Sequence, residues 1–405
     1  MKTGNTLKSN KPGAMPHCEA AVEWLPVDCG KLPARAAVSR FRGSDGVTEC
    51  HITVQLASHS ETPLTILDLA WHLALASAGL DPSSTVFRRI FCSDPANQSK
   101  DIAAKTRHAS GAVSIIGQTP LPSAKFALWS QHLVDPSGPL DVIREGSSCD
   151  CRRGALTHHW IAGLADPEGR SSGEQSRNVL DQHESWLAAN DMTLAAHVVR
   201  TWWFARHIDS DYQGLVDARR EYFLTHGLNR ETHYIASTGI AGAHTEMAAK
   251  LSLDSYAIAG LRSEQVTYLQ SPDHLCPTHD YGVTFERATS IAYRDRKQVY
   301  LSGTASIDRD GRIVHEGDVL KQLDRTLENI EALLATAGAN TGDLAVILVY
   351  LRDPADAVSV DAALRERFGQ VPMVLLHAPV CRPGWLIEIE GLAIVPAHHP
   401  HLPPF

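Results

Sequence analysis

One order of segments occurs three times along the 405 residues, and this repeat restricts the fold more than any other feature. The clearest copy begins with a β-branched stretch and a small-residue turn, Lys297 to Asp308. Leucines and an isoleucine at helical spacing follow between Val319 and Gly338. A continuous apolar run (344–353), a second helical pattern (356–369) and two further strand patterns (371–379 and 385–395) complete the copy. The predicted order is β-α-β-α-β-β.

The same order precedes this copy twice. One copy extends from 157 to 261, and a more diverged one from 49 to 134. The pairing of "VYLRDPADAVSVDAALRERF" with "WWFARHIDSDYQGLVDARREYF" goes beyond a shared order of elements. We therefore expect an α+β protein of three tandem units, each a sheet with helices on one face. The predicted divisions are a disordered leader (1–20), a diverged first unit (21–145), a second unit (150–265) and a third unit (280–400).

Composition and charge exclude several classes of partner. A formal net charge of -9, without a long basic run, argues against nucleic acid and against an anionic membrane surface. The N-terminus has no apolar signal-peptide core, and no segment is long and apolar enough to span a bilayer. Eight scattered cysteines are typical of reduced thiols, so we expect a cytoplasmic protein. The spacing of Cys149 and Cys151, in an expected interdomain loop, does not favour zinc, and we expect no metal.

The last strand pattern, "WLIEIEGLAIV", carries two carboxylates. Side chains alternate along a strand, so Glu388 and Glu390 share one face while Ile387 and Ile389 share the other. The isoleucines are expected to face the helices and the glutamates to face a cleft between units. The corresponding strands of the other copies, "LSLDSYAIA" and "AKFALWSQH", have apolar or neutral groups where Glu388 falls. At most one of three inter-unit pockets is therefore expected to be active.

The segment from Thr284 to about Pro396 resembles the Rid (YjgF) superfamily. The resemblance rests on "VYLSGTASIDRDGRIVHEGDVLKQLDRTLENIEALLATAGA", "VYLRDPADAVSVDAALRERF" and "LIEIEGLAI". Members are homotrimers with a chorismate-mutase-like fold and pockets between subunits. Three copies in one chain then imply an intrachain pseudo-trimer that is a monomer or a weak dimer. The resemblance also implies that Glu388 is the acid/base residue and that the turn Ser302, Gly303 and Thr304 lines its pocket.

The chain departs from the imine deaminases of this family and resembles its chorismatases. Those deaminases have a carboxylate-binding Arg where Met373 stands, and the usual opening Tyr is replaced by Phe285. Similarity to the chorismatases lies in "FERATS", "SGTAS" and the pair Cys381 and Arg382 ahead of the glutamate. In that branch a Cys at this position accompanies the formation of 3-hydroxybenzoate. The glycine-rich turn and the Tyr-Pro-rich segment of the chorismatases are absent from this sequence.

The expected chemistry follows from the glutamates. Burial and a neighbouring carboxylate raise the pKa of an acid, so Glu388 beside Glu390 suits protonation of an enol ether. A dicarboxylate substrate also needs guanidinium partners. The candidates are Arg382, Arg287, Arg352 and Arg219. Cys381 has no histidine in its local pattern to activate it, so we expect it to shape the pocket or steer the product.

The leading hypothesis is a cofactor-independent enzyme of aromatic secondary metabolism that cleaves chorismate, or another small anionic or conjugated metabolite, as a chorismatase does. Two alternatives remain open at this stage. One is an imine or enamine hydrolase, or an isomerase or cyclase, that uses Glu388 on a different conjugated intermediate. The other is a non-catalytic ligand-binding protein.

Overall fold

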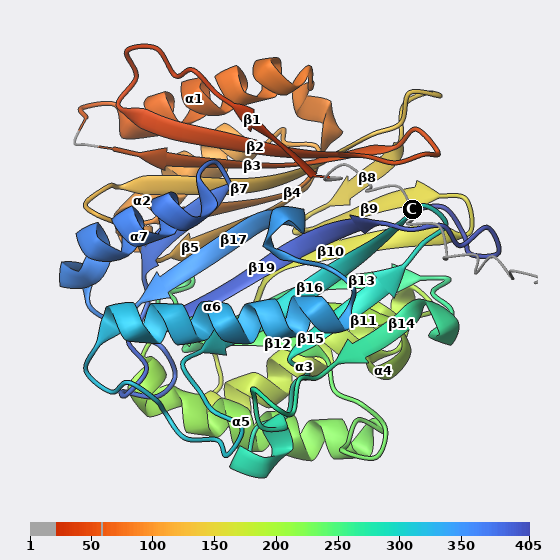
Figure 1. Ribbon diagram of the computed structural model, residues 1–405, viewed down its shortest axis with the longest axis vertical. Coiled ribbons are helices and arrows are strands. Elements are labelled where there is room, and N and C mark those ends of the chain that lie inside the picture. Colours follow the sequence, from red (N-terminus) through yellow and green to blue (C-terminus); the bar gives the residue numbers. More distant parts are fainter. Residues whose placement is uncertain (1–21, 58–59) are drawn as a thin grey trace, which may run out of the picture.

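The computed structural model describes residues 22–57 and 60–405, and the predicted leader lies outside them. Within these residues the chain forms an α+β structure with three sheets, as predicted from the repeat. The helices lie at the periphery and the sheets face the middle of the molecule (Figure 1). Helix α1 is at the top of this view, α6 crosses the front and α3 and α5 lie at the bottom. The three units thus surround a common interior.

The first sheet has the order β1-β2-β3-β7-β4-β5, in which only β4 and β5 run parallel to each other. Helix α1 begins with a proline in its first turn and ends at Gly79, whose φ of 68° suits a residue without a side chain. The elements of this unit are β1 (Val22–Pro26), β2 (Ala34–Arg42), β3 (Thr48–Leu56), α1 (Pro63–Ala78), β4 (Thr85–Cys92), α2 (Pro95–Thr106), β5 (Ala112–Gly117) and β7 (Phe126–Val134).

The second sheet has the order β12-β11-β13-β10-β9-β8. Helix α3 is capped by Ser171, whose hydroxyl accepts a hydrogen bond from the backbone N–H of Glu174. The elements are β8 (Asp141–Glu145), β9 (Ser148–Arg153), β10 (Leu156–Ala165), α3 (Ser172–Ala189), α4 (Leu194–His197), β11 (Val198–Ala205), α5 (Ile208–Thr225), β12 (Ala236–Ala241) and β13 (Leu251–Ala259).

The third sheet has the order β14-β15-β16-β19-β17-β18-β6. Its outer strand β6 (Thr119–Pro120) comes from the first unit and pairs with β18, which ties the two units together. The elements are β14 (Val266–Leu269), β15 (Ala288–Ala292), β16 (Arg296–Ala305), α6 (Val319–Thr336), β17 (Leu344–Leu351), α7 (Ala357–Phe368), β18 (Met373–His377) and β19 (Ile387–Pro396). Short 3-10 helices occupy Pro82–Ser84, Ser263–Gln265, Thr278–Tyr281, Thr341–Asp343 and Pro354–Asp356.

Each unit is larger than the repeat indicates, because two strands precede the β-α-β-α-β-β order. The second sheet begins at Asp141 rather than at residue 150, and strands of the third begin at Val266. Cys149 and Cys151 do not lie in a loop: both are buried on β9, which forms a hairpin with β10. No group of three or more His, Cys, Asp or Glu side chains in the described residues is arranged to hold a metal ion. None of the described helices has the length and apolar character needed to cross a membrane.

The shared core explains why the units do not separate. A continuous hydrophobic cluster includes Phe87 of the first unit, Trp202 of the second and Leu348 of the third. Phe87 and Trp202 stack with their ring centroids 6.3 Å apart. Burial of aromatic and aliphatic side chains between sheets removes apolar surface from water, so contacts between units stabilise the same fold as contacts within them.

Candidate active site

Glu388 lies near the start of β19, opposite Tyr350 of β17 and Ala305 of β16. Its side chain is 5% exposed. Ile387 and Ile389 are fully buried on the other face of the strand, so the alternation predicted from the sequence holds. The glutamate therefore faces the second unit, away from the helices of its own unit.

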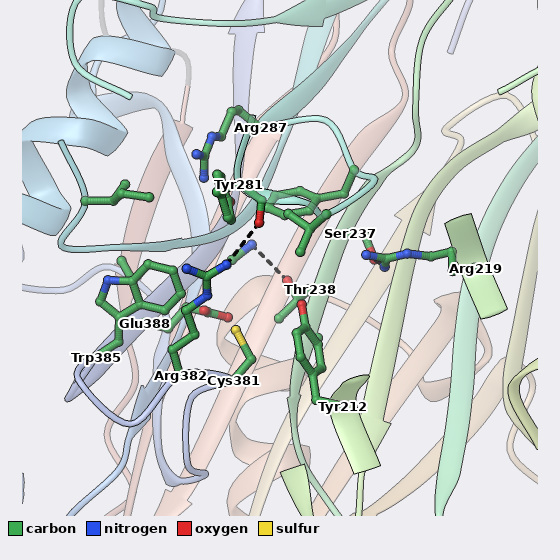
Figure 2. A pocket seen from close by; sticks show the side chains of 16 residues that line it. Tyr212, Arg219, Ser237, Thr238, Tyr281, Arg287, Cys381, Arg382, Trp385 and Glu388 are labelled. Atoms are coloured by element: carbon green, nitrogen blue, oxygen red, sulfur yellow. Dashed lines mark hydrogen bonds between the residues drawn. The ribbon is translucent and has the colours of Figure 1, made fainter. Parts of the chain in front are cut away.

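The space beside Glu388 is a pocket between the second and third units. Figure 2 shows side chains from both units and from the loop before β15 converging on it. The second unit contributes Tyr212, Arg219, Ser237, Thr238 and Gly239. The loop and the third unit contribute Tyr281, Val283, Phe285, Arg287, Gly303, Ala305, Ile307, Cys381, Arg382, Trp385 and Glu388.

The Glu388 carboxyl is protonated at neutral pH. Burial and, to a smaller extent, the nearby charge of Glu390 raise its pKa to about 8, against the opposing charges of Arg200 and Arg287. No described residue makes a hydrogen bond to its side chain. The group is thus a buried acid that carries a proton in a pocket, as the sequence predicts for a general acid.

Glu390 does not line this pocket, contrary to the expectation that it binds substrate. Its Oε2 is 2.5 Å from Nη2 of Arg200 and accepts a hydrogen bond from Thr238. Its Oε1 accepts hydrogen bonds from the indole of Trp202 at 3.0 Å and from the hydroxyl of Tyr350 at 2.9 Å. These contacts bind the carboxylate into the interior between the sheets. Glu390 therefore acts on the pocket through its charge and through Thr238, which it orients.

Three of the four predicted arginines reach the pocket. Arg219 is 2% exposed, donates to Thr284 at 3.2 Å and to Ser237 at 3.4 Å, and its Nη2 has no hydrogen-bond partner among the described residues. Arg287 donates to the carbonyl of Cys276 at 2.8 Å. All three cations are therefore positioned by groups of the protein before any anion binds.

Arg382 stacks on two aromatic rings. Its guanidinium carbon is 4.9 Å from the ring centre of Tyr281 and 5.4 Å from that of Trp385, and Nη2 donates to the carbonyl of Tyr281 at 3.1 Å. The fourth predicted arginine, Arg352, lies outside the pocket. Its guanidinium pairs with Asp209 at 2.9 Å, because the end of β17 faces the start of α5. Arg352 joins the two units and does not line the site.

The predicted turn contributes one lining residue. A Cβ at Gly303 would lie 2.2 Å from Oε1 of Glu388, so only glycine permits this approach. Ser302 and Thr304 are fully buried and support the turn: the hydroxyl of Ser302 donates to the carbonyl of Glu286, and that of Thr304 to the carbonyl of Ser302. These two residues shape the pocket wall without facing it.

Cys381 lies in the pocket with its thiol protonated. Burial raises its pKa to about 12, and the charge of Glu388 adds to the shift. A thiol in this state is a poor nucleophile at neutral pH. The position agrees with the expected role in shaping the pocket.

Strand register identifies the counterparts of the two glutamates in the other units. Each sheet carries a bulge at the start of its central strand, and counting from it places Ser252 and Ala127 where Glu388 stands. Both are neutral, as the sequence predicts. The counterpart of Glu390 in the second unit is Asp254, so a carboxylate at this position is not confined to the third unit.

Register also corrects the argument from Met373. Met373 lies on β18 and pairs with Ile347 of β17. This side of the third sheet meets the first unit, and Met373 does not line the pocket. The pocket is completed by β12 of the second unit, where the corresponding residue is Ser237. Arg219 reaches that position from α5 and donates to the Ser237 hydroxyl. A cation is thus present where Met373 suggests that none exists.

Several aromatic residues of the pocket are not among the site residues predicted from the sequence. Tyr212 on α5, Tyr281 in the loop before β15 and Trp385 before β19 all line it. Burial raises the pKa of Tyr281 to about 12 and that of Tyr212 well above its usual value, so both remain phenols. Trp385 lies two residues before the start of β19, and this nearness to the glutamates could have identified it from the sequence. Tyr212 gave no such signal, because its neighbours resemble any amphipathic helix.

Comparisons with known proteins agree with this architecture. The family model described as endoribonuclease L-PSP matches residues 287–395. A RutC family protein of Pyrococcus abyssi is 32% identical over 97 residues, which are 24% of this chain and 76% of that protein. A 3-hydroxybenzoate synthase of Streptomyces hygroscopicus is 30% identical over 224 residues, 49% of this chain and 63% of the synthase. The match therefore spans less than two thirds of the synthase.

A crystal structure of chorismatase superposes with a TM-score of 0.60 at 18% identity, over 77% of this chain and 93% of that chain. At this identity the match shows a shared fold. The RutC family match, at 32% identity over 76% of that relative, leads to one conclusion: the chain belongs to the Rid (YjgF) superfamily.

Proposed function

We propose that the protein is a chorismatase-like enzyme that cleaves the enol ether of chorismate to give pyruvate and a hydroxybenzoate. One observation carries the proposal: a protonated, buried Glu388 faces a pocket lined by three arginines. The similarity to a 3-hydroxybenzoate synthase supports the choice of substrate. The alternative of a non-catalytic binding protein gives no reason for a carboxyl whose proton is retained at neutral pH.

Glu388 is proposed to donate its proton to the terminal vinyl carbon of the enol ether. The resulting oxocarbenium ion takes up water, and the C–O bond to the former ether oxygen then breaks to give the keto group of pyruvate. The ring product aromatises with loss of one water, so chorismate and the two products contain the same atoms. The Glu388 carboxylate recovers a proton as the added water gives one up.

The arginines are proposed to hold the two carboxylates of the substrate. Arg219 has a free Nη2 and Arg382 has donors beyond its single bond to Tyr281, so both can add charge-assisted hydrogen bonds. Tyr281, Phe285 and Trp385 supply apolar faces for the ring. The pocket thus offers cations at its ends and an apolar wall between them.

The test is to incubate the purified protein with chorismate, to follow pyruvate with lactate dehydrogenase and NADH, and to separate the aromatic product by chromatography. Wild-type protein is expected to turn over, and Glu388→Gln to lose about 10²–10⁴-fold in kcat, the usual contribution of a general acid. No pyruvate at enzyme concentrations equal to the substrate would overturn the proposal. Ammonia release from freshly generated imino acids would then favour the imine hydrolase.

A further inference from the structure

A second hollow lies in the first unit between α1, α2 and the start of β4, far along the chain from the residues of the candidate active site. Half of the side chains that line it are charged or titratable. Those used in the argument are Asp68, Trp71, His72, Arg88, Lys105 and His108. The hollow contains none of the residues proposed to act on chorismate, so a function here is independent of the proposed reaction.

Arg88 forms the floor of this hollow and makes no salt bridge with any described residue, although the charge of Asp68 acts on it from the same hollow. The residue is 8% exposed, and its guanidinium carbon is 3.6 Å from the ring centre of Trp71. Its Nε is buried without a hydrogen-bond partner, and no described residue accepts a hydrogen bond or forms a salt bridge with any of its nitrogens. Burial lowers its pKa to about 10, so it remains charged at neutral pH. A buried cation without a partner is costly, and native proteins rarely retain one without a use.

The buried groups behind Arg88 do not neutralise it. One titratable group on the sheet behind Arg88 is His132, whose pKa burial lowers well below its usual value, and the charge of Arg88 contributes to this shift. His132 is tied to Ser130 at 2.8 Å and to Ser84 at 3.1 Å, and Ser130 also accepts from the indole of Trp71 at 3.0 Å. This neutral network leaves the guanidinium facing outward into the hollow.

The sister units show that the fold does not require a cation at this position. Counted from the bulges, Ile347 and Thr201 occupy the place of Arg88 in the third and second units. Both are buried. In those units the paired helices pack against each other, α6 on α7 and α3 on α5, whereas in the first unit the hollow lies between α1 and α2. The first unit therefore differs from the other two: it has an arginine in a hollow where they have an uncharged residue covered by paired helices.

The rim carries one acidic and one basic side chain together with two histidines. Lys105 stands 3.2 Å and His72 3.8 Å from the carboxylate of Asp68. Asp68 is thus shared by a lysine and a histidine, and it acts on Arg88 through its charge without forming a salt bridge with it. His108 adds a further titratable nitrogen. Arg144 lies close by, but its Nη1 is already bonded to the carbonyls of Thr106 and Ala109.

We propose that the hollow is a binding site for a small anionic metabolite whose carboxylate or phosphate group pairs with Arg88. The planar guanidinium, fixed on the face of Trp71, presents nitrogens in the geometry that carboxylate and phosphate oxygens accept. Lys105 at the rim provides a second cation for a further negative charge, and His108 also lines the hollow. Asp68 excludes ligands that place an anionic group against α1.

Isothermal titration of the full-length protein with inorganic phosphate and, separately, with succinate tests the site and distinguishes the two head groups. The active-site arginines also attract anions, so each titration is repeated in Arg88→Met and in Arg382→Met. For at least one of the two anions, Arg88→Met is expected to lose a binding event that Arg382→Met retains, with Kd weakened at least about tenfold. Pyruvate release from chorismate is expected to be unchanged in Arg88→Met.

Thermal unfolding shows whether Arg88→Met is folded. We expect that it is, because the apolar Ile347 occupies the same position in the third unit. If it is not, Lys105→Ala decides, because this half-exposed side chain is not needed for folding; its Kd is expected to weaken several-fold. Equal binding of both anions by wild type and by the folded Arg88→Met, or by Lys105→Ala in its place, would overturn the proposal. So would loss of all binding in Arg382→Met.

Discussion

Glu388 and Glu390 stand two residues apart on the same face of β19, and their carboxyl groups have opposite surroundings. Glu390 accepts hydrogen bonds from Arg200, Thr238, Trp202 and Tyr350, whereas no described residue donates to Glu388. The charge held on Glu390 raises the pKa of Glu388, and burial raises it more. One carboxylate thus keeps its neighbour protonated, and this difference underlies the first prediction.

The free energy of unfolding is expected to depend on pH through Glu388. Its pKa is about 8 in the folded protein and about 4.5 when unfolded. The folded state therefore binds one more proton between these values, and stability falls as pH rises from about 4.5 to about 8. Glu388→Gln removes this loss, so the variant is expected to gain on wild type by an amount on the order of 4 kcal/mol across that range. Urea unfolding of both proteins at pH 5 and at pH 8.5 measures this gain. If the difference in the free energy of unfolding between variant and wild type is the same at the two pH values, the raised pKa of Glu388 is contradicted.

Gly303→Ala is expected to reduce turnover at least about tenfold by displacing the acid. The added Cβ would lie 2.2 Å from Oε1 of Glu388 and 3.2 Å from Cγ2 of Thr238, so the carboxyl must move. Gly173→Ala in α3 is the matched control, because its Cβ would meet only ordinary contacts, the nearest at 3.5 Å. Steady-state pyruvate release compares them. Similar activity in both variants would mean that the position of Glu388 does not matter.

Arg219→Met is expected to raise KM for chorismate by about tenfold or more, since a buried guanidinium with a free nitrogen faces the pocket. Arg352→Met serves as the control, because Arg352 pairs with Asp209 outside the pocket. Its KM is expected to stay within about twofold of wild type. Kinetics over a range of substrate concentrations separate the two, and a larger effect at Arg352 would refute the assignment of these cations.

Cys381→Ala is expected to keep turnover within about tenfold of wild type while changing the ratio of aromatic products. The thiol, with its pKa raised to about 12, is protonated and cannot act as a nucleophile at neutral pH. Chromatography of the products gives the ratio, and alkylation by iodoacetamide is expected to be slow. Loss of activity as severe as in Glu388→Gln would show that the thiol takes part in the chemistry.

Glu390→Gln is expected to destabilise the protein by about 3–5 kcal/mol, the range for breaking a buried ion pair. The substitution leaves the guanidinium of Arg200 buried without its partner, since the two groups are 2.5 Å apart. Asp209→Asn breaks the more exposed pair with Arg352 and is expected to cost less than about 1 kcal/mol. Chemical denaturation of both variants makes the comparison. A small cost at Glu390 would show that the interior between the sheets tolerates an unpaired cation.

Much of the fold was predictable because it depends on local patterns. Helical spacing in α6 and the apolar run of β17 are properties of short segments, and the repeat multiplied each signal by three. The strands added before each unit were not predicted, since β8 and β9 are short and neither contains a long apolar run. Their place is decided by the pairing of β8 with β9 and of β9 with β10, and not by their own composition.

By itself the sequence determined the three α+β units, the face of β19 that carries Glu388, and the loss of this residue from the other copies. Tertiary structure decided which unit closes the pocket. It showed that Ser237, and not Met373, stands at the relevant position of this pocket, and that Arg219 supplies a cation there. It also assigned Glu390 to a buried network with Arg200, a residue 190 positions away. The physical reason is that periodicity reports only which face of an element is apolar. Which charged groups meet across the interface depends on how three sheets pack against one another.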